Sequence, residues 1–176
     1  MTSITNGGQI EFNYHRTIDM SNYLIETKLF PKNVLETYTL WNLGKDLTSD
    51  QLSVFSDLRG GGQGNYREGI NEKIDNVVEA LQNFPHSKRA LITIPNNSYA
   101  QHSNDDEAKC MREIHFRLDR AKINATVFFR AQAALIFPKN IHFIGSLMKE
   151  IANRINPLLE IGELSYLASV LVNDRQ

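Results

Sequence analysis

The chain has 176 residues, 41% of them hydrophobic and 22% charged, and its 19 basic and 20 acidic residues leave a net charge of −1. This composition is typical of one globular domain spanning 1–176. The near-neutral charge provides no basic face for nucleic acid, and no apolar run approaches the roughly 20 residues that cross a membrane. One cysteine and an N-terminus without the basic-then-apolar layout of a signal peptide favour the reducing cytoplasm, and the scattered histidines form no metal-binding pattern.

The spacing of apolar residues predicts the elements along the chain. Residues 1–12 are polar and rich in turn formers, and we expect a mobile or edge segment there. Apolar residues at helical spacing predict three helices: 33–44, 70–83 and 141–155. Apolar runs and alternation predict four strands: 89–94, 114–118, 123–130 and 164–172. A hairpin turn at 119–122 joins two strands and helices separate the others, so we expect an α/β domain with a mixed sheet packed against helices.

Five residues have side chains that suit a reactive or anion-binding site. Cys110, the only cysteine, directly precedes a predicted strand and is either a small buried hydrophobic residue or a nucleophile. A nucleophilic cysteine needs a nearby cation that favours the thiolate, and Arg130 on the partner strand of the hairpin is a candidate for it. Otherwise Arg130 is a solvated strand end. Asn140, before the last helix, is most simply a turn or N-cap residue, and Lys88-Arg89 is most simply a solvated pair.

Short motifs in a fixed order extend from Leu24 to Leu164, where the last predicted strand begins. They are Leu24-Ile-Glu-Thr-Lys28, Leu40-Trp-Asn-Leu-Gly44, Ser87-Lys88-Arg89, Cys110 followed by Phe116, Arg130-Ala131, Phe137-Pro138-Lys139-Asn140 and Gly162-Glu163-Leu164. Each motif is weak by itself. Their order and nearly constant spacing resemble thymidylate synthase and its relatives, the pyrimidine hydroxymethylases, in which the first motif is a strand.

The resemblance implies a covalent mechanism on a thymidylate synthase-like fold. Cys110 would attack C6 of a pyrimidine nucleotide and so activate C5 for methyl or hydroxymethyl transfer from methylene-tetrahydrofolate. Arg130 would bind the 5′-phosphate, and Asn140 would read the base edge. In this family the arginine doublet serves the other subunit, so Lys88 and Arg89 would bind the partner's phosphate in a homodimer with a shared active site.

Several family positions are changed. The catalytic glutamate falls at Thr37, although Glu36 is adjacent and a shift of one residue would restore it as a catalytic residue. The other departures are listed in chain order: Gly64 for a tryptophan, Ala133 for an aspartate, Ser169-Val170-Leu171 for a histidine-x-tyrosine pair, and an end at Gln176 before the segment that closes over folate. We therefore expect weakened folate binding. Two alternatives stay open: a non-catalytic nucleotide-binding homologue or partner subunit, and a folate-independent enzyme of specialised metabolism.

Overall fold

The computed structural model describes residues 2–3, 9–60, 65–94 and 109–173. The strands are β1 (Thr2–Ser3), β2 (Gln9–Asp19), β3 (Leu91–Thr93), β4 (Met111–Asp119), β5 (Lys122–Phe129), β6 (Gln132–Ala133) and β7 (Glu160–Asn173). The helices are α1 (Lys32–Asn42), α2 (Ser49–Leu52), α3 (Ile70–Asn83) and α4 (Phe137–Ile155), with the 3₁₀ turns η1 (Asp57–Arg59) and η3 (Ala134–Ile136). No helix within the described ranges has the length and apolar character needed to cross a membrane.

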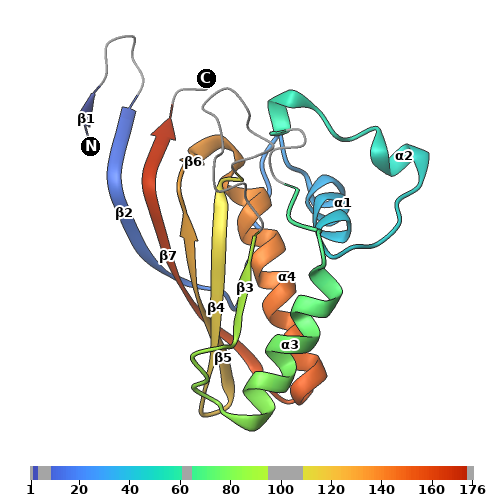
Figure 1. The fold of residues 1–176 in the computed structure, drawn as a ribbon. Coiled ribbons are helices and arrows are strands. Elements are labelled where there is room, and N and C mark those ends of the chain that lie inside the picture. The colour runs from blue at the N-terminus through green and yellow to red at the C-terminus, as the bar shows by residue number, and fades with distance from the viewer. Residues whose placement is uncertain (1, 4–8, 61–64, 95–108, 174–176) are drawn as a thin grey trace.

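The described strands form one mixed sheet in the order β1-β2-β7-β5-β4-β3, and β6 also pairs with β7. Figure 1 shows α1, α3 and α4 together on one side of this sheet. The predicted α/β architecture, a mixed sheet packed against helices, is therefore confirmed.

The β4–β5 hairpin and the crossover through α4 bring several chain ends to one edge of the sheet. β4 and β5 are antiparallel, and the turn between them holds Arg120 in the left-handed region at a φ of +56°. β5 and β7 are parallel, a pairing that needs a long connection, and α4 provides it. As a result, β4 begins at the same edge where β5 and β6 end and α4 starts.

Burial in the sheet and helices follows the expected periodicities. The buried side chains of β5 alternate with more exposed ones along the strand: Ile123, Ala125, Val127 and Phe129. α3 turns one apolar stripe inward: Ile70, Ile74, Val77, Val78 and Leu81. On the opposite side of the sheet, Phe128 of β5 and Leu167 of β7 are paired neighbours that remain 38% and 36% exposed.

The predicted helices and strands are present, with ends that differ by a few residues. α3 has the predicted bounds, and α1 ends shortly before Gly44, whose φ of +76° suits glycine. The largest difference is β2, because 9–19 form one long strand where we expected only an edge segment ending at residue 12. The segment 24–28, which resembles a strand of the family, contains no strand.

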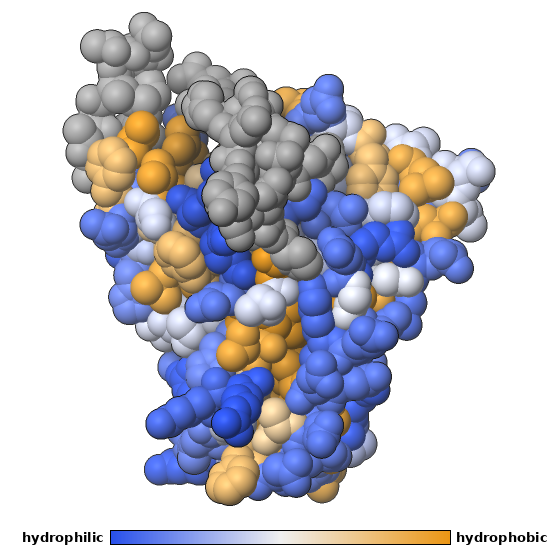
Figure 2. All heavy atoms as spheres, viewed as in Figure 1, coloured by the Kyte–Doolittle hydropathy of each residue, from blue (hydrophilic) through white to orange (hydrophobic). Residues whose placement is uncertain are grey.

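Figure 2 shows mostly hydrophilic side chains on the described surface of this view, with apolar residues gathered beside α2. Leu52 of α2 and Leu58 of η1 are among the exposed leucines. Both lie in the segment that links α1 to α3.

Candidate active site

Cys110 and Arg130 lie side by side at the edge where β4 begins and β5 ends. Cys110 directly precedes β4 and is partly buried, and Arg130 directly follows β5. The backbone N–H of Arg130 donates to the carbonyl oxygen of Cys110 at 2.8 Å. The predicted hairpin is therefore confirmed, and it brings the candidate nucleophile and the candidate cation together.

A small cavity of about 20 Å³ lies beside Cys110. Its other lining residues come from the chain before α3, from β6 and from the start of α4: Tyr66, Ala131, Gln132, Ala133, Ile136 and Asn140. This volume holds about one water molecule, whereas pockets for small molecules usually measure a few hundred Å³. A nucleotide therefore enters only if neighbouring groups move.

Asn140 belongs to a buried hydrogen-bond network. It lies in the first turn of α4, but the N-cap of this helix is Ile136, so the N-cap interpretation of Asn140 is wrong. The Nδ2 of Asn140 donates to the Oε1 of Gln132 at 2.8 Å, and the Oη of Tyr166 donates to the same oxygen at 2.6 Å. All three side chains are buried, so the network holds Asn140 at the wall of the cavity.

Tyr66 provides an aromatic wall of the cavity. Its ring stacks on Phe143 with the ring centroids 6.0 Å apart. Burial raises the pKa of Tyr66 far above its ordinary value and the charge of Cys110 raises it further, whereas a hydrogen bond with the Met111 backbone and the charge of Arg130 lower it. Tyr66 is therefore neutral at physiological pH and lies within electrostatic reach of both candidate site residues.

Sequence reasoning missed Tyr66, Gln132 and Tyr166. They come from three separate parts of the chain, and only Gln132 lies close in sequence to a predicted site residue, two positions after Arg130. This short spacing from Arg130 is the one signal in the sequence that could have pointed to Gln132.

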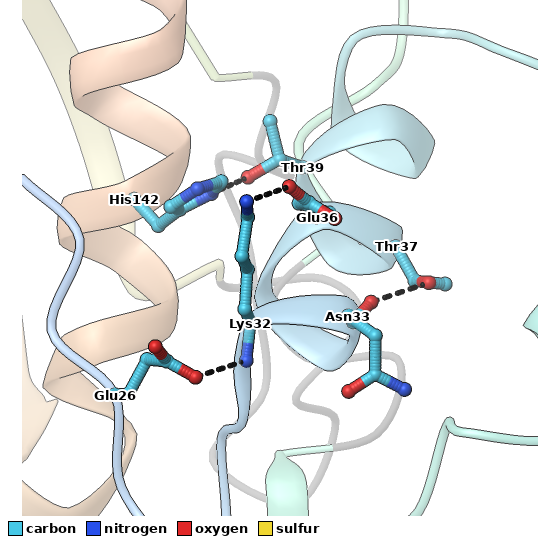
Figure 3. Close-up of polar contacts among 7 residues, drawn as sticks. All are labelled: Glu26, Lys32, Asn33, Glu36, Thr37, Thr39 and His142. Atoms are coloured by element: carbon cyan, nitrogen blue, oxygen red, sulfur yellow. Dashed lines mark hydrogen bonds and ion pairs between the residues drawn. The ribbon is translucent and has the colours of Figure 1, made fainter.

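Glu36 and Thr37 extend from different sides of α1, as Figure 3 shows. Glu36 is exposed, and its carboxylate pairs with Lys32 at 3.7 Å. Thr37 is buried, and its hydroxyl donates to the carbonyl oxygen of Asn33 at 2.8 Å. Neither Glu36 nor Thr37 is among the described residues that line the cavity beside Cys110.

His142 of α4 is tied to α1. Its Nδ1 lies 2.6 Å from the hydroxyl oxygen of Thr39, a contact drawn in Figure 3, and the ring of Tyr23 packs against the imidazole edge-on. Burial lowers the pKa of His142, the charge of Glu36 acts in the opposite direction, and the charge of Lys32 lowers the pKa further. His142 is thus a neutral interior histidine with a hydrogen-bond partner.

Lys88 and Arg89 are exposed and lie toward the far end of β4. The carbonyl oxygen of the next residue, Ala90, accepts from the backbone N–H of Phe116 at 2.8 Å. Phe116 is six positions after Cys110, which corresponds to roughly 20 Å along a strand. A single chain therefore does not bring the basic pair to the candidate nucleophile.

The changed family positions fall in different places. Ala133 lines the cavity, and Ser169-Val170-Leu171 lie on β7, where Leu171 pairs with Gln132 of β6. Gly64 lies outside the described residues. Within the described ranges, no group of three or more His, Cys, Asp or Glu side chains is arranged to hold a metal ion.

Comparison with protein-family models and with curated protein sequences finds no match. The functional assignment therefore depends on the residues and on their geometry.

Proposed function

We propose that this chain is a thymidylate synthase-like enzyme that modifies C5 of a pyrimidine nucleotide through covalent attack of Cys110 on C6. The observation that carries the proposal is the meeting of three candidate residues at one edge of the sheet. Arg130 is hydrogen-bonded to the backbone of Cys110, and Asn140 lines the same cavity as Cys110. The mixed sheet with helices on one side is compatible with a thymidylate synthase-like fold and supports the proposal.

The proposed chemistry begins at the thiolate of Cys110. A bond forms between Sγ and C6 of the ring, and the C5–C6 electron pair shifts to give an enolate that makes C5 nucleophilic. After C5 takes up an electrophile and loses its proton, the thiolate leaves and the ring double bond returns. Arg130 binds the 5′-phosphate through charge-assisted hydrogen bonds, and Asn140 binds the edge of the base.

The described residues do not fit methylene-tetrahydrofolate. The cavity beside Cys110 has no carboxylate among its described lining residues, and Ala133 stands there in place of the family's aspartate. Glu36 is exposed and paired with Lys32. We therefore derive no step through folate, and the proposal is limited to covalent activation of C5.

A homodimer with a shared active site is part of the proposal. The side of the sheet opposite the helices carries Phe128 and Leu167 as exposed neighbours, which suits face-to-face packing of two sheets. Lys88 and Arg89 lie roughly 20 Å along β4 from Cys110 of the same chain. They serve a phosphate site only if that site belongs to the partner subunit.

The second candidate function is a non-catalytic nucleotide-binding homologue or partner subunit. The exposed position of Glu36 favours it, because an enzyme of this kind needs a group that moves protons beside the base. Nucleotide binding without any exchange at C5 is the result that would select this alternative.

The test of the proposed function is exchange of the C5 hydrogen of pyrimidine nucleotides for deuterium in D₂O. Exchange requires addition at C6 and protonation at C5, but no folate. We expect exchange with the wild-type chain and none with Cys110→Ser.

A further inference from the structure

We infer that Gln132 is a positioning residue that fixes the side-chain amide of Asn140 with its oxygen available to the cavity. The site would then take a heterocycle that donates an N–H to this oxygen. The identity of the ligand rests on the proposed function, whereas the role of Gln132 rests on the hydrogen bonds alone.

The direction of the Gln132 amide is set by the main chain. Its Nε2 donates to the carbonyl oxygen of Ala133 at 2.6 Å, and a carbonyl oxygen can only accept. The Oε1 of Gln132 must therefore face the other way. Gln132 is 2% exposed, so solvent does not compete for these bonds.

The direction of the Asn140 amide follows from that of Gln132. The Oε1 of Gln132 can only accept, so Asn140 must turn its Nδ2 toward it, as the 2.8 Å contact records. Tyr166 donates to the same oxygen at 2.6 Å and reinforces this polarity. The side chain of Asn140 has no other hydrogen bond within the described residues and lines the cavity, so its Oδ1 is left as an acceptor.

A buried acceptor favours a ligand that supplies a donor. Bringing a second acceptor to the Oδ1 of Asn140 leaves two buried lone pairs unmatched, which costs roughly ten- to a hundredfold in affinity. A ring with N–H at the contact point, as in uracil, satisfies Asn140. A ring with a bare nitrogen at that point, as in cytosine, does not.

Three variants separate the role of Gln132 from general packing. Gln132→Leu removes the acceptor that holds Asn140. Gln132→Glu, as the neutral acid, keeps this acceptor, because the O–H of the acid can donate to Ala133 while its carbonyl oxygen still accepts from Asn140. Tyr166→Phe removes the second donor without touching the Gln132–Asn140 bond, and it serves as the matched control for loss of one buried hydrogen bond.

The first readout is the side-chain NH₂ signal of Asn140 in ¹⁵N-labelled protein, assigned by its absence in Asn140→Asp. We expect slow hydrogen exchange in wild type, Gln132→Glu and Tyr166→Phe, and exchange at least about tenfold faster in Gln132→Leu. An unchanged exchange rate in Gln132→Leu, or fast exchange in wild type, would overturn the positioning role whether or not any nucleotide binds.

The second readout is titration with uridine and cytidine 5′-monophosphates. We expect wild type and Tyr166→Phe to prefer the uridine nucleotide at least about tenfold, and Gln132→Leu to reduce this preference to within about threefold. A preference that persists in Gln132→Leu contradicts the inference while leaving the proposed function intact. If wild type binds neither nucleotide, the proposed function and the ligand assignment fail, and the Asn140 exchange rates still decide the role of Gln132.

Discussion

The backbone N–H of Arg130 donates a 2.8 Å hydrogen bond to the carbonyl oxygen of Cys110. This bond ties the residue before β4 to the residue after β5, at the sheet edge where α4 begins. Because the bond joins two backbone groups, substitution of either side chain leaves the bond in place. Variants at Cys110 and Arg130 therefore test the chemistry of the site with little effect on the hairpin that builds it.

Arg130→Gln should make Cys110 less reactive. A cation close to a thiol favours the thiolate, which is the form that reacts with alkylating agents. Loss of about 1 kcal/mol of charge stabilisation predicts roughly fivefold slower alkylation by iodoacetamide at neutral pH. The rate is measured directly, because Cys110 is the only cysteine of the chain.

The matched control for this experiment is Arg117→Gln. Arg117 is an arginine of the same hairpin, seven positions along the chain from Cys110. The Arg117→Gln substitution should leave the alkylation rate of Cys110 unchanged. Equal slowing by both substitutions would show that overall charge, rather than the position of Arg130, controls Cys110.

The stability of the fold should fall at mildly acidic pH because of His142. Burial lowers the pKa of His142 in the folded chain, so the unfolded chain takes up a proton first, near pH 6.5. The contribution of neutral His142 to the free energy of unfolding is complete above that pH and is lost as the pH falls toward the lowered pKa. This group changes the free energy of unfolding by at most about 1.4 kcal/mol per pH unit.

Urea unfolding at pH 7.5 and 5.5 measures this effect. His142→Asn keeps a polar partner for Thr39 but does not titrate, so its stability should change less between the two pH values than that of wild type. His15→Asn, at an exposed histidine of β2, should behave like wild type. A wild-type pH dependence in His142→Asn would exclude His142 as its source.

The periodicity of apolar residues predicts the helices and strands that have regular apolar patterns. It does not predict the contacts between these elements. Residues 70–83 show one apolar stripe, and α3 has those bounds. β2 was missed because most of its residues are polar, so its pairing with β7 rather than its composition defines it.

The candidate site divides in the same way. Cys110 and Arg130 could be paired from sequence, because one hairpin joins them and alternation sets its register. The hydrogen-bond network of Gln132 could not be predicted from sequence, because its member Tyr166 belongs to β7, the strand that follows α4 in the chain. The position of Glu36 follows from the rotation of α1, which buries Val34, Leu35 and Tyr38 and leaves Glu36 in solvent.

Subunits with different defects should restore each other's activity if the site is shared. One subunit carries Cys110→Ser, and the other carries Lys88→Ala with Arg89→Ala. Mixed dimers then contain one site in which an intact Cys110 faces an intact basic pair. Random pairing predicts roughly a quarter of wild-type C5 exchange in an equimolar mixture of inactive parents.

A mixture as inactive as its parents would contradict the shared site, provided that light scattering shows dimers. If the doubly substituted Lys88/Arg89 chain is fully active alone, the basic pair has no role in the site. A monomeric wild-type chain would contradict the dimer directly.

The covalent step that we propose is the addition of Cys110 to C6 of a pyrimidine nucleotide. The most direct test is proton NMR of the C5 hydrogen in D₂O, with uridine, cytidine and their 2′-deoxy 5′-monophosphates, for wild type and Cys110→Ser. Tyr66→Phe accompanies them as a variant that keeps the aromatic wall of the cavity and the thiol. We predict loss of the C5 signal with wild type for at least one nucleotide and retention of the signal with Cys110→Ser. An undiminished C5 signal for all four nucleotides with wild type, or equal exchange with Cys110→Ser, would contradict the claim.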